Sequence, residues 1–175
     1  FARQDMMKLI EVDVNSTIDS AMSLLGEQLR LHEIDVELAL APDLPQVTGE
    51  PYQLEQVWIN MVSNARDAVD EKAARAAKGE FATNGSYRKK IRIATALAEK
   101  AITISFQDNG VGIPEENKNK ILEPFFTTKE VGKSTGLGLS ISYGIIENHK
   151  GKITFESKAG EGTTMTVTLP AGAAP

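Results

Sequence analysis

The sequence predicts a two-layer α/β sandwich in which helices cover a mixed β-sheet. Segments with apolar residues at helical spacing are interleaved with segments in which apolar and polar residues alternate, as they do in half-buried strands. Several of these strands form hairpins, and no strand–helix–strand unit repeats along the chain. This arrangement favours a mixed sheet, and we expect about five strands with three main helices on one face.

Helical spacing marks three long segments and one short one. Asn15 or Ser16 is expected to cap the first, because both side chains can accept a hydrogen bond from the first helical turn. Pro51 opens the second at a first-turn position that suits its fixed φ angle. Pro114 precedes the short segment. The predicted helices cover about residues 16–32, 51–71, 115–122 and 137–148.

Alternating or β-branched segments predict the strands, and polar, glycine-containing segments predict the loops. Residues 72–88 are polar and contain glycine, and residues 123–135 show no sustained period, so we expect a long loop in each range. Residues 1–10 have the pattern of a helix that ends there. The predicted strands cover residues 11–14, 34–40, 90–96, 101–107, 152–157 and 163–169.

The composition excludes several classes of function. The chain has 175 residues and a net charge of −5, which gives no support to nucleic-acid binding. It contains no cysteine, so a thiol nucleophile and a cysteine-bound metal are excluded, and its two histidines are too few for a histidine-rich zinc site. No signal peptide opens the chain, and no apolar run is as long as a membrane span. These features predict a soluble, cytoplasmic domain.

Two asparagines carry the first chemical signal. Asn60 and Asn64 are four residues apart, which places both side chains on one face of the second helix, opposite its apolar stripe. Asparagine is a poor helix former, so two of them in mid-helix point to contacts with a bound group. The alternative is a solvated face that happens to hold two amides.

The second signal is Asp108-Asn-Gly-Val-Gly112, at the end of a predicted strand. A carboxylate at the end of an apolar strand face suits the exocyclic amine of adenine. Gly110 and Gly112 allow the backbone to turn tightly against a flat ligand. The alternative is an ordinary Asp-Asn-Gly turn between strands.

The third signal is Gly132-Lys-Ser-Thr-Gly136-Leu-Gly138, a glycine-rich loop that opens into the last helix. The backbone N–H groups at such a helix start can hold an anion, and Lys129 and Lys133 add positive charge. The alternative is that the glycines only start the helix. The segment is not a P-loop, because the required first glycine position holds Thr127.

His32 resembles the start of a phospho-accepting histidine motif, but the residues that follow it alternate like a strand. We therefore do not expect it to carry phosphate. His149 lies near a predicted helix C-terminus and is expected to pack there or to complement the helix dipole.

In this order and spacing, the three motifs resemble the N, G1 and G2 boxes of the GHKL ATPases. Pro124-Phe-Phe126, between the second and third motifs, resembles the F box of sensor histidine kinases. The likeness runs from near Ser16 to Leu169 and is closest to the catalytic and ATP-binding domain of two-component histidine kinases of the nitrogen-regulator type. It implies the end of a dimerisation and phosphotransfer helix at 1–10, an ATP-binding kinase domain over 11–170 and a disordered tail at 171–175.

The resemblance implies a role for each matching position. Asn64 would give its amide oxygen to Mg²⁺, Asp108 would accept the adenine amine, and Asn60 and Lys129 would act in catalysis near the γ-phosphate. Phe125 and Phe126 would anchor a lid over the nucleotide. The implied nucleotide-binding residues are Asn60, Asn64, Asp67, Asp108, Gly110, Gly112, Ile113, Phe125, Phe126, Thr128, Lys129, Lys133, Ser134, Thr135, Gly136, Leu137, Gly138 and Leu139.

The resemblance also implies partners. The γ-phosphate of ATP would pass to a histidine on the dimerisation and phosphotransfer domain and then to a response regulator. The fragment itself would be monomeric and the parent protein homodimeric. Asp67 departs from the pattern, because many sensor kinases carry Lys or His there. Two alternatives remain: the ATPase module of a conformational clamp, which usually has a carboxylate at position 60, and a serine kinase that inhibits a sigma factor.

Overall fold

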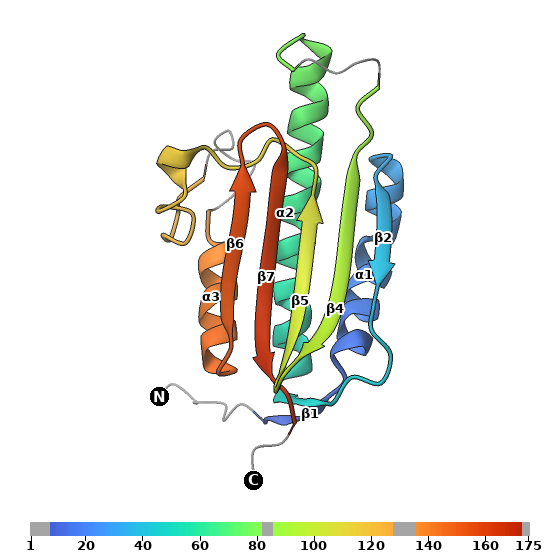
Figure 1. The fold of residues 1–175 in the computed structure, drawn as a ribbon, viewed down its shortest axis with the longest axis vertical. Coiled ribbons are helices and arrows are strands. Elements are labelled where there is room, and N and C mark those ends of the chain that lie inside the picture. The colour runs from blue at the N-terminus through green and yellow to red at the C-terminus, as the bar shows by residue number, and fades with distance from the viewer. Residues whose placement is uncertain (1–7, 82–85, 128–135, 173–175) are drawn as a thin grey trace, which may run out of the picture.

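The computed structural model describes residues 8–81, 86–127 and 136–172, and within these ranges it forms the predicted α/β sandwich. A five-stranded sheet has the order β2-β4-β5-β7-β6, and three α-helices lie on one of its faces (Figure 1). Strand β2 runs parallel to β4 and the other neighbours are antiparallel, so the sheet is mixed. The elements are β1 (Ile10–Val12), α1 (Val14–Leu31), β2 (Asp35–Ala39), β3 (Val47–Gly49), α2 (Pro51–Ala77), β4 (Lys90–Ala98), β5 (Ala101–Asp108), a short 3₁₀ helix (Glu115–Asn117), α3 (Gly138–Asn148), β6 (Lys152–Lys158) and β7 (Gly162–Pro170).

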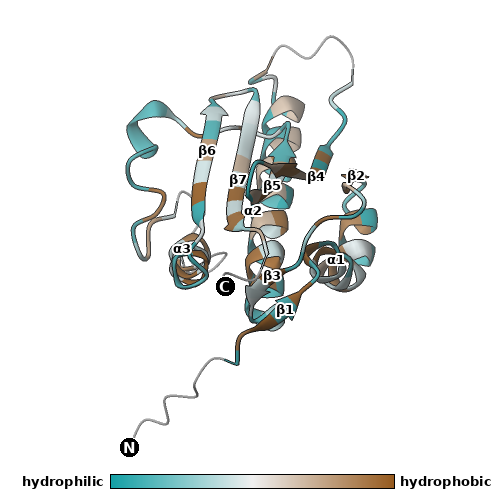
Figure 2. Cartoon of the chain, turned by 60° about the horizontal axis from the view of Figure 1, so that its bottom comes forward, coloured by the Kyte–Doolittle hydropathy of each residue, from teal (hydrophilic) through white to brown (hydrophobic). Residues whose placement is uncertain are grey.

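The two predicted hairpins, β4–β5 and β6–β7, are confirmed. Strand β3 was not predicted. It is three residues long and pairs antiparallel with β1, and Figure 2 shows this small sheet beside the helices. Of the helix end predicted at residues 1–10, residues 1–7 lie outside the described ranges, and Ile10 belongs to β1 instead.

The predicted cap of α1 is wrong. Asp13 caps the helix, and its carboxylate accepts a hydrogen bond of 3.2 Å from the backbone N–H of Ser16. The amide of Asn15 instead donates to the carbonyl of Ala41 at 2.8 Å, so this side chain ties the helix to the chain after β2. The cap of α2 is Glu50, directly before Pro51, as the predicted start requires.

The predicted loop over 72–88 is also partly wrong, because α2 continues to Ala77. Four of the five residues at positions 73–77 are alanine, the strongest helix former, and Arg75 lies one turn after Glu71 with an N–O distance of 3.6 Å. Gly79 has φ of 79° and ends the helix.

The short helix predicted over 115–122 is confined to the 3₁₀ helix at Glu115–Asn117. The residues that follow, Lys118-Asn-Lys120, are polar and provide no apolar face on which a longer helix could pack.

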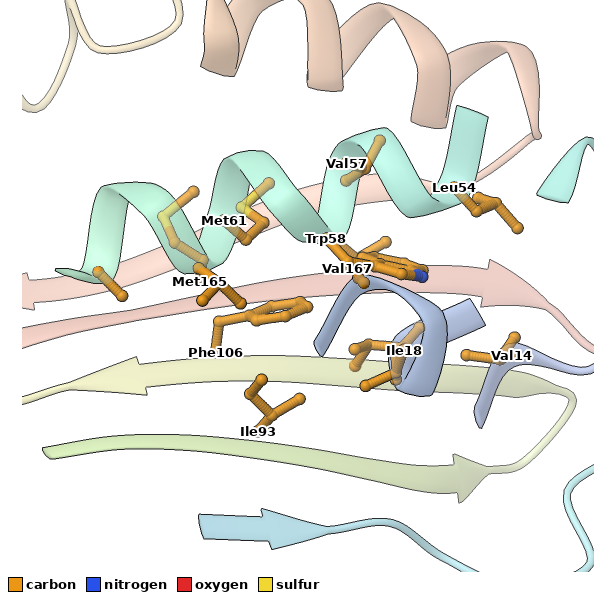
Figure 3. Packing of buried hydrophobic residues seen from close by; sticks show 14 of the residues in the cluster. Val14, Ile18, Leu54, Val57, Trp58, Met61, Ile93, Phe106, Met165 and Val167 are labelled. Carbon is orange, nitrogen blue, oxygen red and sulfur yellow. The ribbon is translucent and has the colours of Figure 1, made fainter. Parts of the chain in front are cut away.

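The core lies between α2 and the sheet. The rings of Trp58 and Phe106 stack with centroids 5.6 Å apart, and both side chains are fully buried (Figure 3). The indole N–H of Trp58 donates to the hydroxyl of Thr17 at 2.8 Å, and that hydroxyl donates to the carbonyl of Val14 at 2.7 Å. This chain of hydrogen bonds joins α2 to α1 inside the core. No helix in the described ranges is long and apolar enough to cross a membrane.

Thr17→Val should destabilise the fold by about 1–3 kcal/mol, because it keeps the shape of the side chain but leaves the buried indole N–H of Trp58 without an acceptor. Urea unfolding measures the change. Ser23→Ala is the matched control, since Ser23 also bonds a backbone carbonyl of α1 but is exposed. Equal losses in the two variants would contradict the prediction.

Candidate functional site

A cavity of about 200 Å³ lies between α2, the end of β5 and the start of α3. The sequence-predicted residues that line it are Asn64, Asp67, Asp108, Gly112, Ile113, Phe126, Gly136, Gly138 and Leu139. The fold therefore brings residues from all three motifs to one place. The remaining lining residues are Met61, Ala65, Ala68, Glu71, Phe106, Val111, Pro114, Asn117, Ile121, Thr127, Thr163 and Met165.

Asp108 ends β5 as predicted, and its side chain is buried in the wall of the cavity with only 9% of the residue exposed. Its carboxylate accepts a hydrogen bond of 2.8 Å from the N–H of Gly110. Burial raises the pKa of Asp108 to about 6, against the lowering effects of the N–H groups of Gly110 and Thr163 and of the Lys72 charge. Above that pH, the carboxylate is an ionised acceptor in a largely apolar pocket.

The two glycines after Asp108 are needed by the packing of the chain itself. A Cβ atom on Gly110 would lie 2.5 Å from the carbonyl carbon of Ala68, so this turn packs directly on α2. Gly112 has φ of 68°, and a Cβ atom there would lie 2.1 Å from the carbonyl oxygen of Lys158. Their role toward a bound base stays a prediction.

Gly138 lines the cavity where α3 begins. It has an ordinary negative φ, and a Cβ atom there would meet nothing closer than 3.7 Å, so the chain itself does not require a glycine. The N-cap residue is Leu137, whose side chain cannot accept a hydrogen bond from the first turn. The helix start is thus suited to an external anion.

Asn60 lies beside this helix start. Its amide nitrogen donates to the carbonyl of Gly138 at 3.2 Å and to the hydroxyl of Ser142 at 3.1 Å, so it connects α2 to α3. The second asparagine, Asn64, lines the cavity itself. The two amides of the first motif therefore have different surroundings.

The two phenylalanines between the second and third motifs, Phe125 and Phe126, also differ. Phe126 lines the cavity, whereas Phe125 has φ of 65° and is 72% exposed. Gly136 packs on the backbone of Phe125, because a Cβ atom there would lie 2.4 Å from its carbonyl carbon. The other predicted residues of this region, Thr128, Lys129, Lys133, Ser134 and Thr135, lie outside the described residues.

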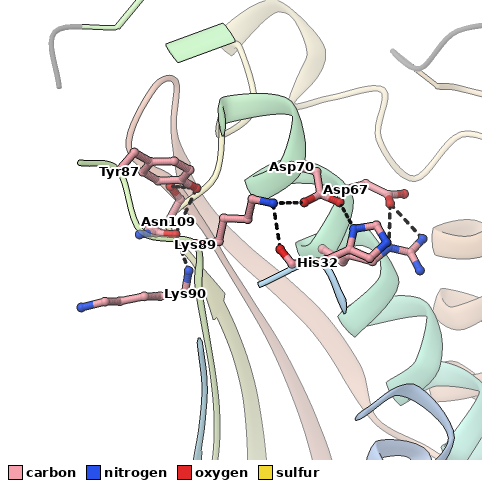
Figure 4. A network of polar contacts seen from close by, with 8 residues as sticks. His32, Asp67, Asp70, Tyr87, Lys89, Lys90 and Asn109 are labelled. Atoms are coloured by element: carbon pink, nitrogen blue, oxygen red, sulfur yellow. Dashed lines mark hydrogen bonds and ion pairs between the residues drawn. The ribbon is translucent and has the colours of Figure 1, made fainter. Parts of the chain in front are cut away.

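Sequence reasoning missed several residues that shape the site. Thr163 lines the cavity and pairs with Asp108 across β5 and β7, a register that the local pattern does not reveal. Asn109 holds the turn after Asp108: its side chain accepts from the N–H of Lys90 at 2.9 Å (Figure 4). It also donates to the carbonyl of Arg88 at 2.8 Å. The sequence Asp108-Asn109-Gly110, which is typical of turns, is the signal from which this role of Asn109 could have been predicted.

Both histidines have structural contacts. His149 is 5% exposed, accepts from the N–H of Glu50 at 3.0 Å and contacts the carbonyl of Ile145 at 2.7 Å. His32 lies 2.5 Å from the carboxylate of Asp70 (Figure 4). Among the residues that the structure describes, no three histidine or acidic side chains converge to hold a metal ion.

The family model described as "Histidine kinase-, DNA gyrase B-, and HSP90-like ATPase" matches residues 49–173. The chain belongs to this ATPase family. It is 37% identical over 160 residues to sporulation kinase E of Bacillus subtilis and 35% identical over 175 residues to the two-component sensor PprA of Pseudomonas aeruginosa. These matches cover 91% and 99% of this chain but only 19% and 18% of the relatives, so it spans about a fifth of their length.

Solved structures agree with this assignment. The catalytic domain of the histidine kinase ThkA is 32% identical, with a TM-score of 0.76, and the match covers 94% of this chain and 97% of that one. ThkA in complex with the response regulator protein TrrA is 29% identical, with a TM-score of 0.70, and the match covers 94% of this chain and 42% of that one. The α/β sandwich is therefore that of a histidine kinase catalytic domain.

Asp108 should make the fold less stable as the pH rises from about 4 to about 7. Its pKa is about 6 in the folded protein and 3.8 in the unfolded reference, so the folded state binds more protons across this range. The loss from this one group is on the order of 3 kcal/mol. The measurement is the free energy of unfolding against pH for the native chain and Asp108→Asn, in which the other groups are unchanged. Parallel curves would contradict the prediction.

Proposed function

We propose that this chain binds ATP with Mg²⁺ and transfers the γ-phosphate to a histidine of a dimerisation and phosphotransfer domain in a two-component sensor kinase. The observation that carries the proposal is the buried carboxylate of Asp108 in the wall of an apolar cavity that also reaches the start of α3. The relatives are named as a sporulation kinase, a two-component sensor and, in Escherichia coli, the sensor histidine kinase ZraS, which supports the same reaction.

Adenine fits the part of the cavity near Asp108. The side chains of Met61, Ile113 and Met165 offer an apolar slot for a flat ring. An ionised carboxylate that already accepts from backbone N–H groups retains further lone pairs for the exocyclic amine of the base. A buried, charge-assisted hydrogen bond of this kind gives selectivity as well as affinity, because a base without the amine would leave the remaining lone pairs of the desolvated carboxylate without a donor.

The donors on α2 fit a magnesium ion. Mg²⁺ prefers oxygen ligands, keeps several waters and is held through few protein groups and the phosphates. Asn64 supplies an amide oxygen in the cavity, and the carboxylates of Asp67 and Glu71 line the same wall. The ion would neutralise charge on the phosphates, while Asn64 would orient it and Asp67, which also pairs with Arg66 at 2.9 Å, would orient its waters.

The phosphate end fits the start of α3. The N–H groups of the first turn and the positive end of the helix dipole favour an anion there, and Gly138 leaves room for close approach. Phosphoryl transfer depends mainly on position and charge, so these groups can serve it without a covalent intermediate. Lys129 and Lys133 would add positive charge from the preceding segment.

Asn60 favours transfer over hydrolysis. An amide cannot take a proton from water as a carboxylate can, and the amide of Asn60 already binds the backbone and a side chain of α3. This argues against the clamp ATPase alternative, in which a carboxylate at this position activates water. The response regulator, as in the ThkA complex with TrrA, would then accept the phosphate from the histidine.

Calorimetric titration with a non-hydrolysable ATP analogue, with and without Mg²⁺, tests the nucleotide site. The native chain should bind more tightly with Mg²⁺. Asp108→Ala should weaken binding about ten- to a hundred-fold in both conditions, because it removes a hydrogen bond to a charged group. Asn64→Ala should weaken only the Mg²⁺-dependent part. Unchanged affinity in folded Asp108→Ala would sink the adenine assignment, and equal losses in Asn64→Ala would argue against metal ligation.

Incubation with γ-labelled ATP should leave the isolated chain without acid-labile phosphate, because both ring nitrogens of His149 have backbone partners and His32 pairs with Asp70. A phosphotransfer domain of a similar sensor kinase, added in trans, should become labelled on histidine. Labelling of a protein serine would favour the sigma-factor kinase instead, and stable histidine labelling of the chain alone would refute the expected division of roles.

A further inference from the structure

The C-terminal turns of α2 and the segment before β4 meet behind the turn that carries Asp108. Their contact is formed by three side chains, Lys72, Phe81 and Tyr87, which we call the bracket. The ammonium of Lys72 lies 4.9 Å from the ring centroid of Tyr87 and 5.8 Å from that of Phe81. Cations at these distances are attracted to the faces of aromatic rings, so the two rings hold the ammonium of Lys72 in place.

The bracket holds the backbone of Asn109. Lys72 Nζ donates to the carbonyl of Asn109 at 3.1 Å, and the hydroxyl of Tyr87 donates to the same oxygen at 3.0 Å. Figure 4 shows Tyr87 directed at Asn109, whose side chain is bound by the start of β4. Burial, followed by the charges of Asp108 and Asp70, raises the pKa of Tyr87 well above its usual range, so the hydroxyl keeps its proton and donates.

The bracket is also supported from the β6–β7 turn. A Cβ atom on Gly160 would lie 3.3 Å from the ring of Phe81, so the ring packs against that turn. The N–H of Gly160 donates to the carbonyl of Val111 at 2.6 Å. Two segments far apart in the sequence therefore fix the backbone on both sides of Gly110.

Acidic, neutral and basic groups surround Asp108. Asp67 and Glu71 of α2 line the same cavity, and burial is the effect that opposes ionisation of Asp108. From the segment before β4, Tyr87 contributes a neutral hydroxyl, and from β7, Thr163 contributes only a backbone N–H. Lys72 is the cation whose charge acts on Asp108 in the described residues.

We propose that Lys72 is a positioning residue for adenine recognition: through the bracket it fixes the turn from Asp108 to Gly110, and it places a positive charge near the Asp108 carboxylate. The proposal rests on the proposed function and assigns a role to the extended end of α2, which the family resemblance leaves without one. Lys72 does not line the cavity, so it acts on the nucleotide through Asp108 and Asn109.

The test is binding of MgADP from about pH 5 to about pH 8 to the native chain, Lys72→Met, Lys72→Arg and Arg75→Met. Arg75→Met is the matched control, because Arg75 lies one turn further along α2, with its guanidinium 5.0 Å from the Phe81 ring, and pairs with Glu80 instead of Asn109. Protonation of the nucleotide is common to all four proteins and cancels in the comparison.

Lys72→Met should bind about three- to tenfold more weakly at mildly acidic pH and should lose affinity at a higher pH than the native chain, because Asp108 protonates more readily. Lys72→Arg should restore the native profile, and Arg75→Met should retain it. Tyr87→Phe should weaken binding at all pH values without moving the profile, since it removes a neutral donor to Asn109.

A nucleotide-free measurement separates the two proposals. The carboxyl ¹³C shift of Asp108, followed by NMR through the same pH range, should report a higher pKa in Lys72→Met than in Arg75→Met. Identical titrations and identical MgADP profiles in these two variants would overturn the role of Lys72 and leave the proposed function intact. Absence of MgADP binding by the folded native chain would refute the proposed function, and the proposal about Lys72 would fall with it.

Discussion

The packing of α2 against the sheet is the constraint on which the site depends. The stacked rings of Trp58 and Phe106 and the indole hydrogen bond to Thr17 fix this helix in both rotation and height. Because the apolar stripe of α2 faces the core, the opposite stripe, which carries Asn64, faces the cavity and the start of α3. The position of Asn64 in the cavity wall is thus a consequence of core packing. A substitution in the core would therefore displace Asn64 without contacting it.

The site contains a buried carboxylate, Asp108, whose ionised form destabilises the fold, and neighbouring groups that reduce this loss of stability. A carboxylate in an apolar wall is unfavourable when it is ionised, and backbone N–H groups from two segments and the charge of Lys72 reduce this penalty for Asp108. The residual penalty leaves the free protein with a poorly solvated acceptor. A ligand amine that donates a hydrogen bond to Asp108 reduces this penalty. Part of the stability that the folded protein loses by burying Asp108 therefore favours the binding of ligands that carry such an amine.

The fold class and the hairpins could be predicted because each rests on a local pattern, helical spacing or strand alternation, whereas the convergence of the motifs was implied by the family resemblance. The wrong or missing predictions concern contacts between residues far apart in the sequence, which local patterns do not encode. Asp13 rather than Asn15 caps α1, and the amide oxygen of Asn15 instead accepts from the hydroxyl of Thr95, far along the chain. Thr163 and Tyr87 join the site only through sheet register and the fold of a distant segment.

The hydrogen bonds of Asn60 make the two main helices of the site a coupled pair. Its amide spans from α2 to the first turn of α3, while the Ser142 hydroxyl contacts the same Gly138 carbonyl at 2.8 Å. Ile145 and Ile146 of α3 are buried in the same core as α2, so apolar packing and the amide of Asn60 hold the two helices together. A change that displaces α2 would therefore move the start of α3 with it, and the two walls of the cavity would shift as one unit.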